Sequence, residues 1–287
     1  MLQGKIGVIG GTGLYEIEGM TDIKEVNIET PFGKPSDGII TGNLNGTGMA
    51  FLPRHGRGHR ILPGDIPSRA NIYALKSLGV EYIISVNSCG SFKDAIKPGS
   101  LLVPDQVIDR TQGRVSTFFG DGVVAHVSMA EPFCQVLSDI LYQSAQECNA
   151  DVHFKGTYIA MEGPAFSTRA ESYLYQSWGA DVVGMTVFPE AKLAREAEIC
   201  YASICCVTDY DCWKEECVTA DIIIEHMKQN ITMAKRIIKL AIGKASKKRT
   251  CGCASSLKNA IVTAPAVMTL TQRKKFDLLI GKYIEKK

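Results

Sequence analysis

Short apolar runs alternate with helix-like segments over the first four-fifths of the chain, and this alternation constrains the fold more than any other feature. Because it is typical of strands joined by helices, it predicts an α/β fold with a largely buried sheet. The expected strands span 5–9, 48–52, 82–86, 100–103, 156–161, 181–183 and 199–207. The expected helices span 67–79, 132–148, 168–178, 189–197, 221–242 and 271–285, with Thr219 as N-cap of the long one.

The chain of 287 residues is long enough to bury a full core, and no internal repeat or long linker precedes Lys244. We therefore expect one domain over residues 1–243, followed by a C-terminal extension over residues 244–287 that carries Cys251-Gly-Cys253 and a helix. The basic cluster between Lys244 and Arg249 is interpreted as a solvated loop.

Composition excludes several classes of partner. Hydrophobic residues at 45% and charged residues at 22% match an ordinary globular protein. A net charge of +2 predicts no bulk attraction to nucleic acid or to a membrane surface. No segment approaches the ~20 apolar residues that span a bilayer, and the N-terminus has no secretory pattern, so we expect a cytoplasmic protein.

Polar clusters follow several of the expected strands. They are Gly10–Gly13, Arg54-His55-Gly56, Asn87-Ser88, Met185-Thr186 and Thr208–Asp211. Ligands of α/β sheets bind beyond the carboxyl ends of strands, so these clusters predict one shared pocket.

Part of this pocket suits an anion. The glycine-rich loop lacks the spacing of a dinucleotide loop and the lysine of a Walker loop, and a plain turn explains it equally well. As a binding loop it would offer backbone N–H groups and the Thr12 hydroxyl. Arg54 beside His55 can fork two donors onto an oxyanion, although surface Arg-His pairs are common. Asn87, Ser88 and Thr186 add neutral donors.

Asp209 and Asp211 are candidates for general acid catalysis. That role requires a pKa raised by burial, and the apolar run from Cys205 to Val207 just before them would provide it. The alternative is that one of them caps the following helix.

Ten cysteines leave three roles open: buried hydrophobes, reactive thiols and metal ligands. Zinc sites usually bring a second Cys or His pair at short spacing, and none flanks Cys251 and Cys253. We therefore expect no metal site, and the redox state of Cys200, Cys205, Cys206, Cys251 and Cys253 stays open.

Seven motifs carry a specific resemblance. They are Ile6–Gly13, Thr30–Ser36, Arg54–Arg57, Met129–Phe133, Glu162–Pro164, Gly184–Thr186 and Thr208–Trp213. Together, from about Lys5 to Ile242, the chain resembles the S-methyl-5'-thioadenosine phosphorylases, a family of trimeric nucleoside phosphorylases. The resemblance implies a central mixed sheet flanked by helices, and a homotrimer or a dimer of trimers. It also implies phosphate as co-substrate and no metal or organic cofactor. The implied reaction converts methylthioadenosine and phosphate to adenine and 5-methylthioribose 1-phosphate.

The resemblance also implies roles for individual residues. Phosphate would be held by Thr12, Arg54, His55, Asn87, Ser88 and Thr186. Asp209 would protonate or hydrogen-bond purine N7, and Asp211 would meet the 6-amino group. The other substrate-binding positions would be Phe166, Ser167, Met185, Tyr210, His59, His126 and Ala220, with the His126 loop reaching from a neighbouring subunit to the 5' pocket.

Two rival functions remain. A 6-oxopurine nucleoside phosphorylase carries Glu at Ser167 and Asn at Asp209, so both positions favour adenine here. Broader use of adenosine, inosine or methylthioinosine stays open because Ala220 is small. A binding module without catalysis is the second rival.

Gly184 and Asn87-Ser88 depart from the residues that some relatives carry at these positions. The tail after Lys244 resembles that of thermophile and archaeal members, in which cysteines form intrachain disulfides.

Overall fold

A computed structural model describes residues 5–11, 14, 17–214, 220–245 and 249–284, with the backbone alone for Lys5 and 220–229. An eleven-stranded sheet forms its centre, with strand order β2-β3-β4-β1-β5-β10-β9-β7; β11 pairs with β5 and β6, and β8 pairs with β6. The strands are β1 (Lys5–Gly10), β2 (Thr21–Val26), β3 (Ile39–Leu44), β4 (Thr47–Pro53), β5 (Val80–Ser91), β6 (Leu101–Val103), β7 (Gln106–Arg110), β8 (Val152–Phe154), β9 (Thr157–Met161), β10 (Val182–Gly184) and β11 (Cys200–Asp209).

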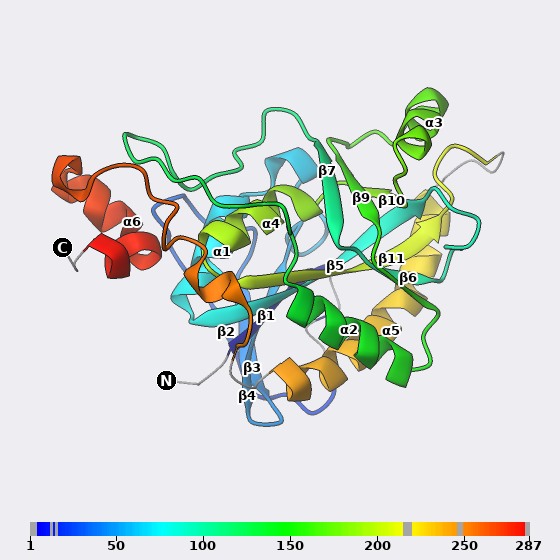
Figure 1. The fold of residues 1–287 in the computed structure, drawn as a ribbon. Coiled ribbons are helices and arrows are strands. Elements are labelled where there is room, and N and C mark those ends of the chain that lie inside the picture. The colour runs from blue at the N-terminus through cyan, green and yellow to red at the C-terminus, as the bar shows by residue number, and fades with distance from the viewer. Residues whose placement is uncertain (1–4, 12–13, 15–16, 215–219, 246–248, 285–287) are drawn as a thin grey trace.

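Helices cover both faces of the sheet (Figure 1). They are α1 (Ser68–Ser77), α2 (Gln135–Glu147), α3 (Arg169–Ser177), α4 (Val187–Glu196), α5 (Ala220–Ala245) and α6 (Leu270–Ile284). α1 and α4 lie on one face, whereas α2 and α5 lie on the other. α6 lies at one end of the sheet, on the side of α1, so the C-terminal extension packs onto the same core.

Alternation along the strands explains these two faces. In β5, Ile83 joins the apolar cluster under α1 and α4, while Ile84 joins the one under α2 and α5. In β11, Cys205 and Cys206 divide in the same way. Because successive side chains of a strand point to opposite faces, an unbroken apolar run is what a strand buried on both sides requires.

The long strand β5 sets the position of the polar clusters. It pairs in parallel with β1 and β11 and in antiparallel with β10 near its end. Asn87 and Ser88 of β5 lie opposite Cys205 and Cys206 of β11. The mixed sheet therefore brings the ends of β1, β5, β10 and β11 to one region.

The structure confirms the α/β fold, the mixed sheet and the expected elements, most of them to within a few residues at their ends. The exception is β5, which continues to Ser91, so Asn87 and Ser88 lie within this strand and the expectation that they follow it was wrong. Thr168 is the N-cap of α3 and forms a reciprocal capping box with Glu171. Thr219 lies outside the described residues. Four strands were not predicted: β2, β3, β7 and β8. Across the described residues, no helix is long and apolar enough to cross a membrane.

Candidate active site

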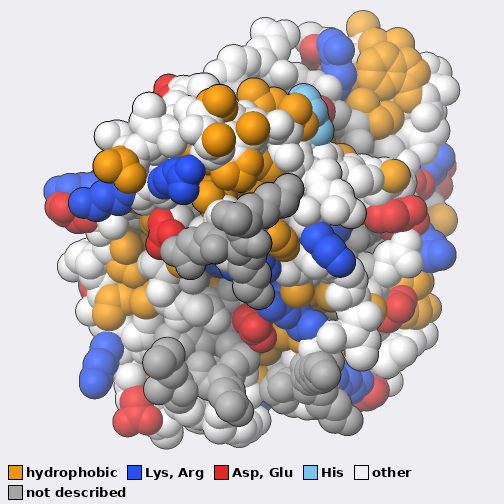
Figure 2. All heavy atoms as spheres, turned by 60° about the vertical axis from the view of Figure 1, so that its left-hand side comes forward, with side chains coloured by type: hydrophobic (Ala, Val, Ile, Leu, Met, Phe, Trp, Pro, Cys, Tyr) orange, Lys and Arg blue, Asp and Glu red, His pale blue; other side chains and the backbone are white. Residues whose placement is uncertain are grey.

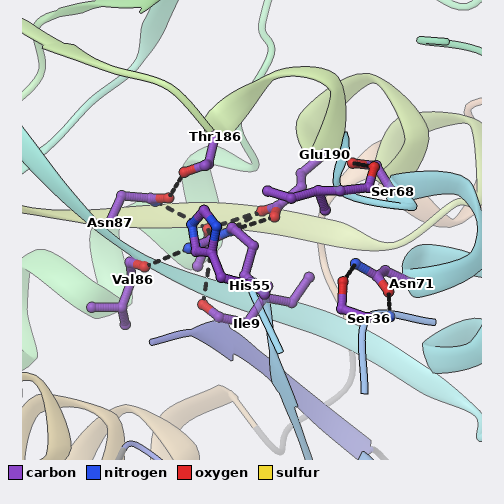
Figure 3. Close-up of polar contacts among 12 residues, drawn as sticks. Ile9, Ser36, His55, Ser68, Asn71, Val86, Asn87, Thr186 and Glu190 are labelled. Carbon is purple, nitrogen blue, oxygen red and sulfur yellow. Dashed lines mark hydrogen bonds and ion pairs between the residues drawn. The ribbon is translucent and has the colours of Figure 1, made fainter. Parts of the chain in front are cut away.

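Three of the polar clusters meet near the ends of β4, β5 and β10 (Figure 3). Arg54 and His55 follow β4 directly, Asn87 lies within β5, and Thr186 follows β10. A backbone hydrogen bond links these three clusters to the fourth, which begins at Gly10: the Arg54 N–H donates to Gly10 O at the end of β1. Thr12, in that fourth cluster, lies outside the described residues.

Arg54 is held in a buried ion pair. Its Nε lies 2.5 Å from Glu190 Oε1, and its Nη2 lies 3.1 Å from Oε2. Nη1 donates to Val86 O at 2.9 Å, and Nη2 donates to Ser85 Oγ at 2.6 Å. The side chain is 3% exposed. The guanidinium is thus fixed in one orientation with its charge balanced inside the protein, and its contact with phosphate stays a prediction.

Sequence reasoning missed Glu190, the partner of Arg54. Besides Arg54, its Oε2 accepts from Tyr201 Oη at 2.9 Å and from Ser85 Oγ at 3.2 Å. A signal was available, because Glu190 stands in the first turn of α4 directly between the apolar stretch Val187–Pro189 and Ala191. Carboxylates are almost never buried unless they are paired, so this one required a basic partner.

Asn87 organises the neutral donors. Its Nδ2 donates to Ser203 Oγ at 2.7 Å and to Ser85 Oγ at 3.0 Å. Its Oδ1 accepts from Thr186 Oγ1 at 2.6 Å. The amide is therefore occupied on both sides, and it orients the hydroxyl of Thr186, which is only half-buried. Ser88, next along β5, is also half-buried.

His55 has a defined tautomer. Its Nδ1 lies 2.8 Å from Ile61 O, and a carbonyl oxygen only accepts, so Nδ1 carries the hydrogen. Burial lowers the pKa of His55 to about 4, so the ring is neutral at pH 7 and Nε2 is an acceptor. The His59 ring stacks on it at a centroid distance of 4.2 Å, although His59 itself is exposed.

The two aspartates differ in environment. Asp209 is half-buried; its Oδ2 accepts from Thr208 Oγ1 at 2.7 Å and its Oδ1 accepts from the Asp211 N–H at 2.8 Å. Asp211 is 4% exposed, and its carboxylate accepts from the Ser172 hydroxyl of α3. Burial raises the pKa of Asp211. Burial therefore makes Asp211 a weaker acid, and Asp209 is the aspartate that lies nearer to solvent.

The loop before α3 lies against this segment. The Cys212 thiol donates to Ser167 O at 2.9 Å, and Ser167 Oγ lies 3.6 Å from Met161 Sδ. Phe166 is 47% exposed. Tyr210 Oη donates to Asp94 O at 3.5 Å, away from Asp209. The fold thus brings Ser167 beside the Asp209–Cys212 stretch, whereas the side chain of Ala220 lies outside the described residues.

A second residue missed from the sequence is Arg114. Its Nη1 donates to Met185 O at 2.5 Å and its Nη2 donates to Glu162 O at 2.5 Å. Its Nε lies 3.0 Å from Glu162 Oε2. Arg114 therefore ties the backbone of Glu162 to that of Met185. Met185 packs closely on the next residue, Gly163, at which a Cβ would lie 2.4 Å from Met185 Sδ.

His126 lies apart from these contacts. It is exposed, and its N–H donates to Ala260 O of the C-terminal extension at 2.8 Å. A cavity of about 210 Å³ is lined in part by Arg114, but by none of the predicted site residues that the structure describes. Its lining is Phe32, Pro63, Gly64, Ile66, Pro67, Ser68, Arg69, Ala70, Gly113, Arg114, Val115 and Pro189. The chemistry points instead to the polar side chains at the strand ends.

Known proteins resemble this chain over nearly its full length. A model described as "Phosphorylase superfamily" matches residues 5–243. The S-methyl-5'-thioadenosine phosphorylase of Geobacter sulfurreducens is 56% identical over 97% of this chain and 99% of its own. The enzyme of the same name from Hyperthermus butylicus is 50% identical over 91% of this chain and 97% of its own.

Solved structures agree with this similarity. A crystal structure of methylthioadenosine phosphorylase from an antarctic soil metagenomic library superposes with a TM-score of 0.93, at 48% identity over 97% of this chain and 99% of that one. The Schistosoma mansoni methylthioadenosine phosphorylase in complex with adenine has a TM-score of 0.82, at 37% identity over 89% of this chain and 96% of that one. The chain therefore belongs to the phosphorylase superfamily, as a member of its S-methyl-5'-thioadenosine phosphorylases.

Proposed function

We propose that this chain catalyses phosphorolysis of S-methyl-5'-thioadenosine to adenine and 5-methylthioribose 1-phosphate, a salvage reaction for methionine and purine. The observation that carries the proposal is the 56% identity over nearly the whole length to an S-methyl-5'-thioadenosine phosphorylase. The strand-end cluster supplies groups of the kind that the reaction requires.

Phosphate would bind between the ends of β4, β5 and β10. The neutral His55 presents Nε2 as an acceptor, which suits the P–OH of a hydrogen phosphate ion. The half-buried Thr186 is held by Asn87 in a fixed rotamer. Arg54, Ser88 and Thr12 are proposed to complete the site, with Arg54 oriented by Glu190.

Cleavage of the N-glycosidic bond develops positive charge on the ribose, as in glycoside hydrolysis. A bound phosphate anion stabilises this charge and then forms the new bond to C1. Asp209 is proposed to donate a proton or a hydrogen bond to purine N7, so that adenine leaves as a neutral base. No step needs a metal or an organic cofactor.

Recognition of the 6-amino group is proposed for the segment of Asp209 and Asp211, with Ser167 close by. Carboxylate oxygens accept from an amino group, whereas a 6-oxo purine offers them no donor at that position. Met185, Phe166 and Tyr210 would surround sugar and base, and His59 and Ala220 would border the 5' pocket.

The assembly is proposed to be a homotrimer, or a dimer of trimers, in the cytoplasm. Figure 2 shows hydrophobic side chains gathered on the side of the molecule that bears the C-terminal extension. Exposed apolar residues of this region include Val124, Val262, Val267 and Leu270, and Val262 N–H donates to Val124 O. Contact with a second copy of the chain would cover them and bring His126 to a neighbouring site.

A substrate panel tests the proposed specificity. Initial rates with methylthioadenosine, adenosine and inosine, each at saturating phosphate, give three values of kcat/KM. We expect methylthioadenosine to exceed inosine by about 10²-fold, because inosine lacks the 6-amino donor and leaving a buried acceptor unpaired costs about 1–3 kcal/mol. Equal values for inosine would move the assignment to a broad purine nucleoside phosphorylase.

A further inference from the structure

Four cysteines that are far apart in the sequence meet in one cluster. Cys134 is the N-cap of α2, Cys200 is the first residue of β11, and Cys251 and Cys253 flank Gly252 in the C-terminal extension. Their four Sγ atoms lie within 4.8 Å of one another. Three of these side chains are buried and Cys251 is half-buried.

The separations fit a shared metal ion better than paired disulfides. Every described cysteine is a free thiol, and the Sγ atoms of Cys200 and Cys251 lie 3.3 Å apart. A disulfide requires about 2.05 Å between bonded sulfurs. A zinc ion bound tetrahedrally by four sulfurs at about 2.3 Å places the sulfurs about 3.8 Å from each other. The four Sγ atoms, all within 4.8 Å of one another, are therefore close enough to share one ion.

The surroundings offset the negative charge that four thiolates would carry around a divalent ion. Arg195 Nη1 lies 3.8 Å from Cys253 Sγ, and its Nη2 donates to Glu131 O, which holds the guanidinium in place. Cys134 is the N-cap of α2, and the dipole of that helix favours negative charge at its N-terminus. A cation that donates to a ligand sulfur and is itself held in place is a feature of a built thiolate site.

We propose that Cys134, Cys200, Cys251 and Cys253 bind one Zn²⁺ ion in a closed tetrathiolate site. On binding, the four thiols release four protons to solvent and form four Zn–S bonds, with no change of oxidation state. Four protein ligands leave no open position, so the ion is structural and takes no part in the phosphorolysis. Thiolate ligands favour zinc over calcium, magnesium or manganese.

Sequence spacing concealed this site. Cys251 and Cys253 lack a second pair nearby in the chain, which argued against zinc. The fold supplies that pair from the start of α2 and the start of β11, which lie together because the Cys134 N–H donates to Tyr201 O at 2.8 Å.

The ion would fasten the C-terminal extension to the core. Just beyond Cys253, the Leu257 N–H donates to Glu198 Oε1 at 3.2 Å. A little further, Ala125 and Ile261 form a β-bridge and His126 N–H bonds Ala260 O. Metal binding therefore stabilises the C-terminal segment that supports the His126 loop. Loss of the ion would loosen both the segment and the loop.

The test uses the full chain purified with a thiol reductant and without chelator. Elemental analysis should find one zinc per chain, and X-ray absorption at the zinc edge should give four sulfur neighbours at about 2.3 Å. Cys134→Ser and Cys253→Ser should each lose most of the zinc. The matched control is Cys148→Ser, at the other end of α2 and outside the cluster, which should retain it.

Two further measurements keep the outcome decisive if a ligand variant fails to fold. Arg195→Gln, which removes a neighbouring cation and no ligand, should weaken zinc affinity about 10–100-fold. Zinc removal by a chelator should lower the Tm of the wild type, and added Zn²⁺ should restore it. A metal-free protein with four reactive thiols that does not bind added Zn²⁺ would overturn the proposal. Mass spectrometry that finds disulfides among these cysteines, in protein trapped with an alkylating agent, would overturn it as well.

Discussion

Glu190 on α4 lies 2.5 Å from Arg54, which follows β4 more than a hundred residues earlier in the chain, and the two form a bidentate ion pair with both side chains almost fully buried. Removing one partner of such a pair leaves an uncompensated buried charge. The pair lies beside the proposed phosphate site, so it determines where the guanidinium can point.

We expect Glu190→Gln to lower the free energy of unfolding by about 3–5 kcal/mol, as for other broken buried pairs. Because Arg54 would lose its orientation, the KM for phosphate should also rise. Chemical denaturation and phosphate titrations measure the two effects. The matched control is Lys192→Gln on the same helix, which breaks a partly exposed bridge to Asp109 and should cost less than about 1 kcal/mol. A Glu190 variant as stable as this control would contradict the account.

Asn87 and Thr186 should act as a unit in phosphate use. Asn87→Ala and Thr186→Val each remove one end of the 2.6 Å hydrogen bond between them. In a double-mutant cycle on kcat/KM for phosphate, the coupling energy should fall within about 0.5–3 kcal/mol. Strictly additive losses would mean that the bond does not orient Thr186 for phosphate.

His55 should make the protein less stable in mild acid. Its folded pKa of about 4 lies below the ordinary value of 6.5, so between these values the unfolded chain binds more protons. The contribution of His55 to stability is therefore complete above pH 6.5 and is lost as the pH falls towards 4. Urea unfolding across this window should show a shallower pH dependence for His55→Gln than for the wild type. An identical slope in both proteins would show that His55 titrates normally.

The two aspartates should separate in function. Asp209→Asn should lower kcat for methylthioadenosine at least about tenfold, since general acid catalysis contributes about 10²–10⁴-fold, with little loss of stability. Asp211→Asn should instead lower stability and raise the KM for the nucleoside, because Asp211 is buried, bonded to Ser172 of α3 and proposed to meet the 6-amino group. Steady-state kinetics and thermal unfolding of both variants check this. An unchanged kcat for Asp209→Asn would remove it from the acid role.

The central sheet could be predicted because its strands are buried on both faces. Strands such as β5 and β11 are almost entirely buried and contain short apolar runs, which the sequence pattern reveals directly. The edge strand β2 escaped prediction because residues such as Lys24 and Glu25 are exposed there, and β8 has only three residues. Their pairing comes from tertiary contacts that no local pattern records.

The candidate site also contains residues that could be predicted from the sequence and residues that could not. Arg54, Asn87 and Thr186 could be found because each is a polar residue at or just beyond the end of an apolar run in the sequence. Glu190 and Arg114 act through other residues, and their partners lie far away in the chain, so no spacing pointed to them. The four-cysteine cluster was hidden for the same reason, because its ligands come from three separate segments.

Phosphate-dependent cleavage of methylthioadenosine is the most direct test of the proposed function. Purified protein, methylthioadenosine and inorganic phosphate can be followed by adenine absorbance and by ³¹P NMR in the same sample. The account predicts that each adenine released is matched by one inorganic phosphate converted to a sugar phosphate ester, with no adenine formed when phosphate is omitted. Adenine release without phosphate would indicate a hydrolase, and no release under either condition would contradict the assignment as an enzyme.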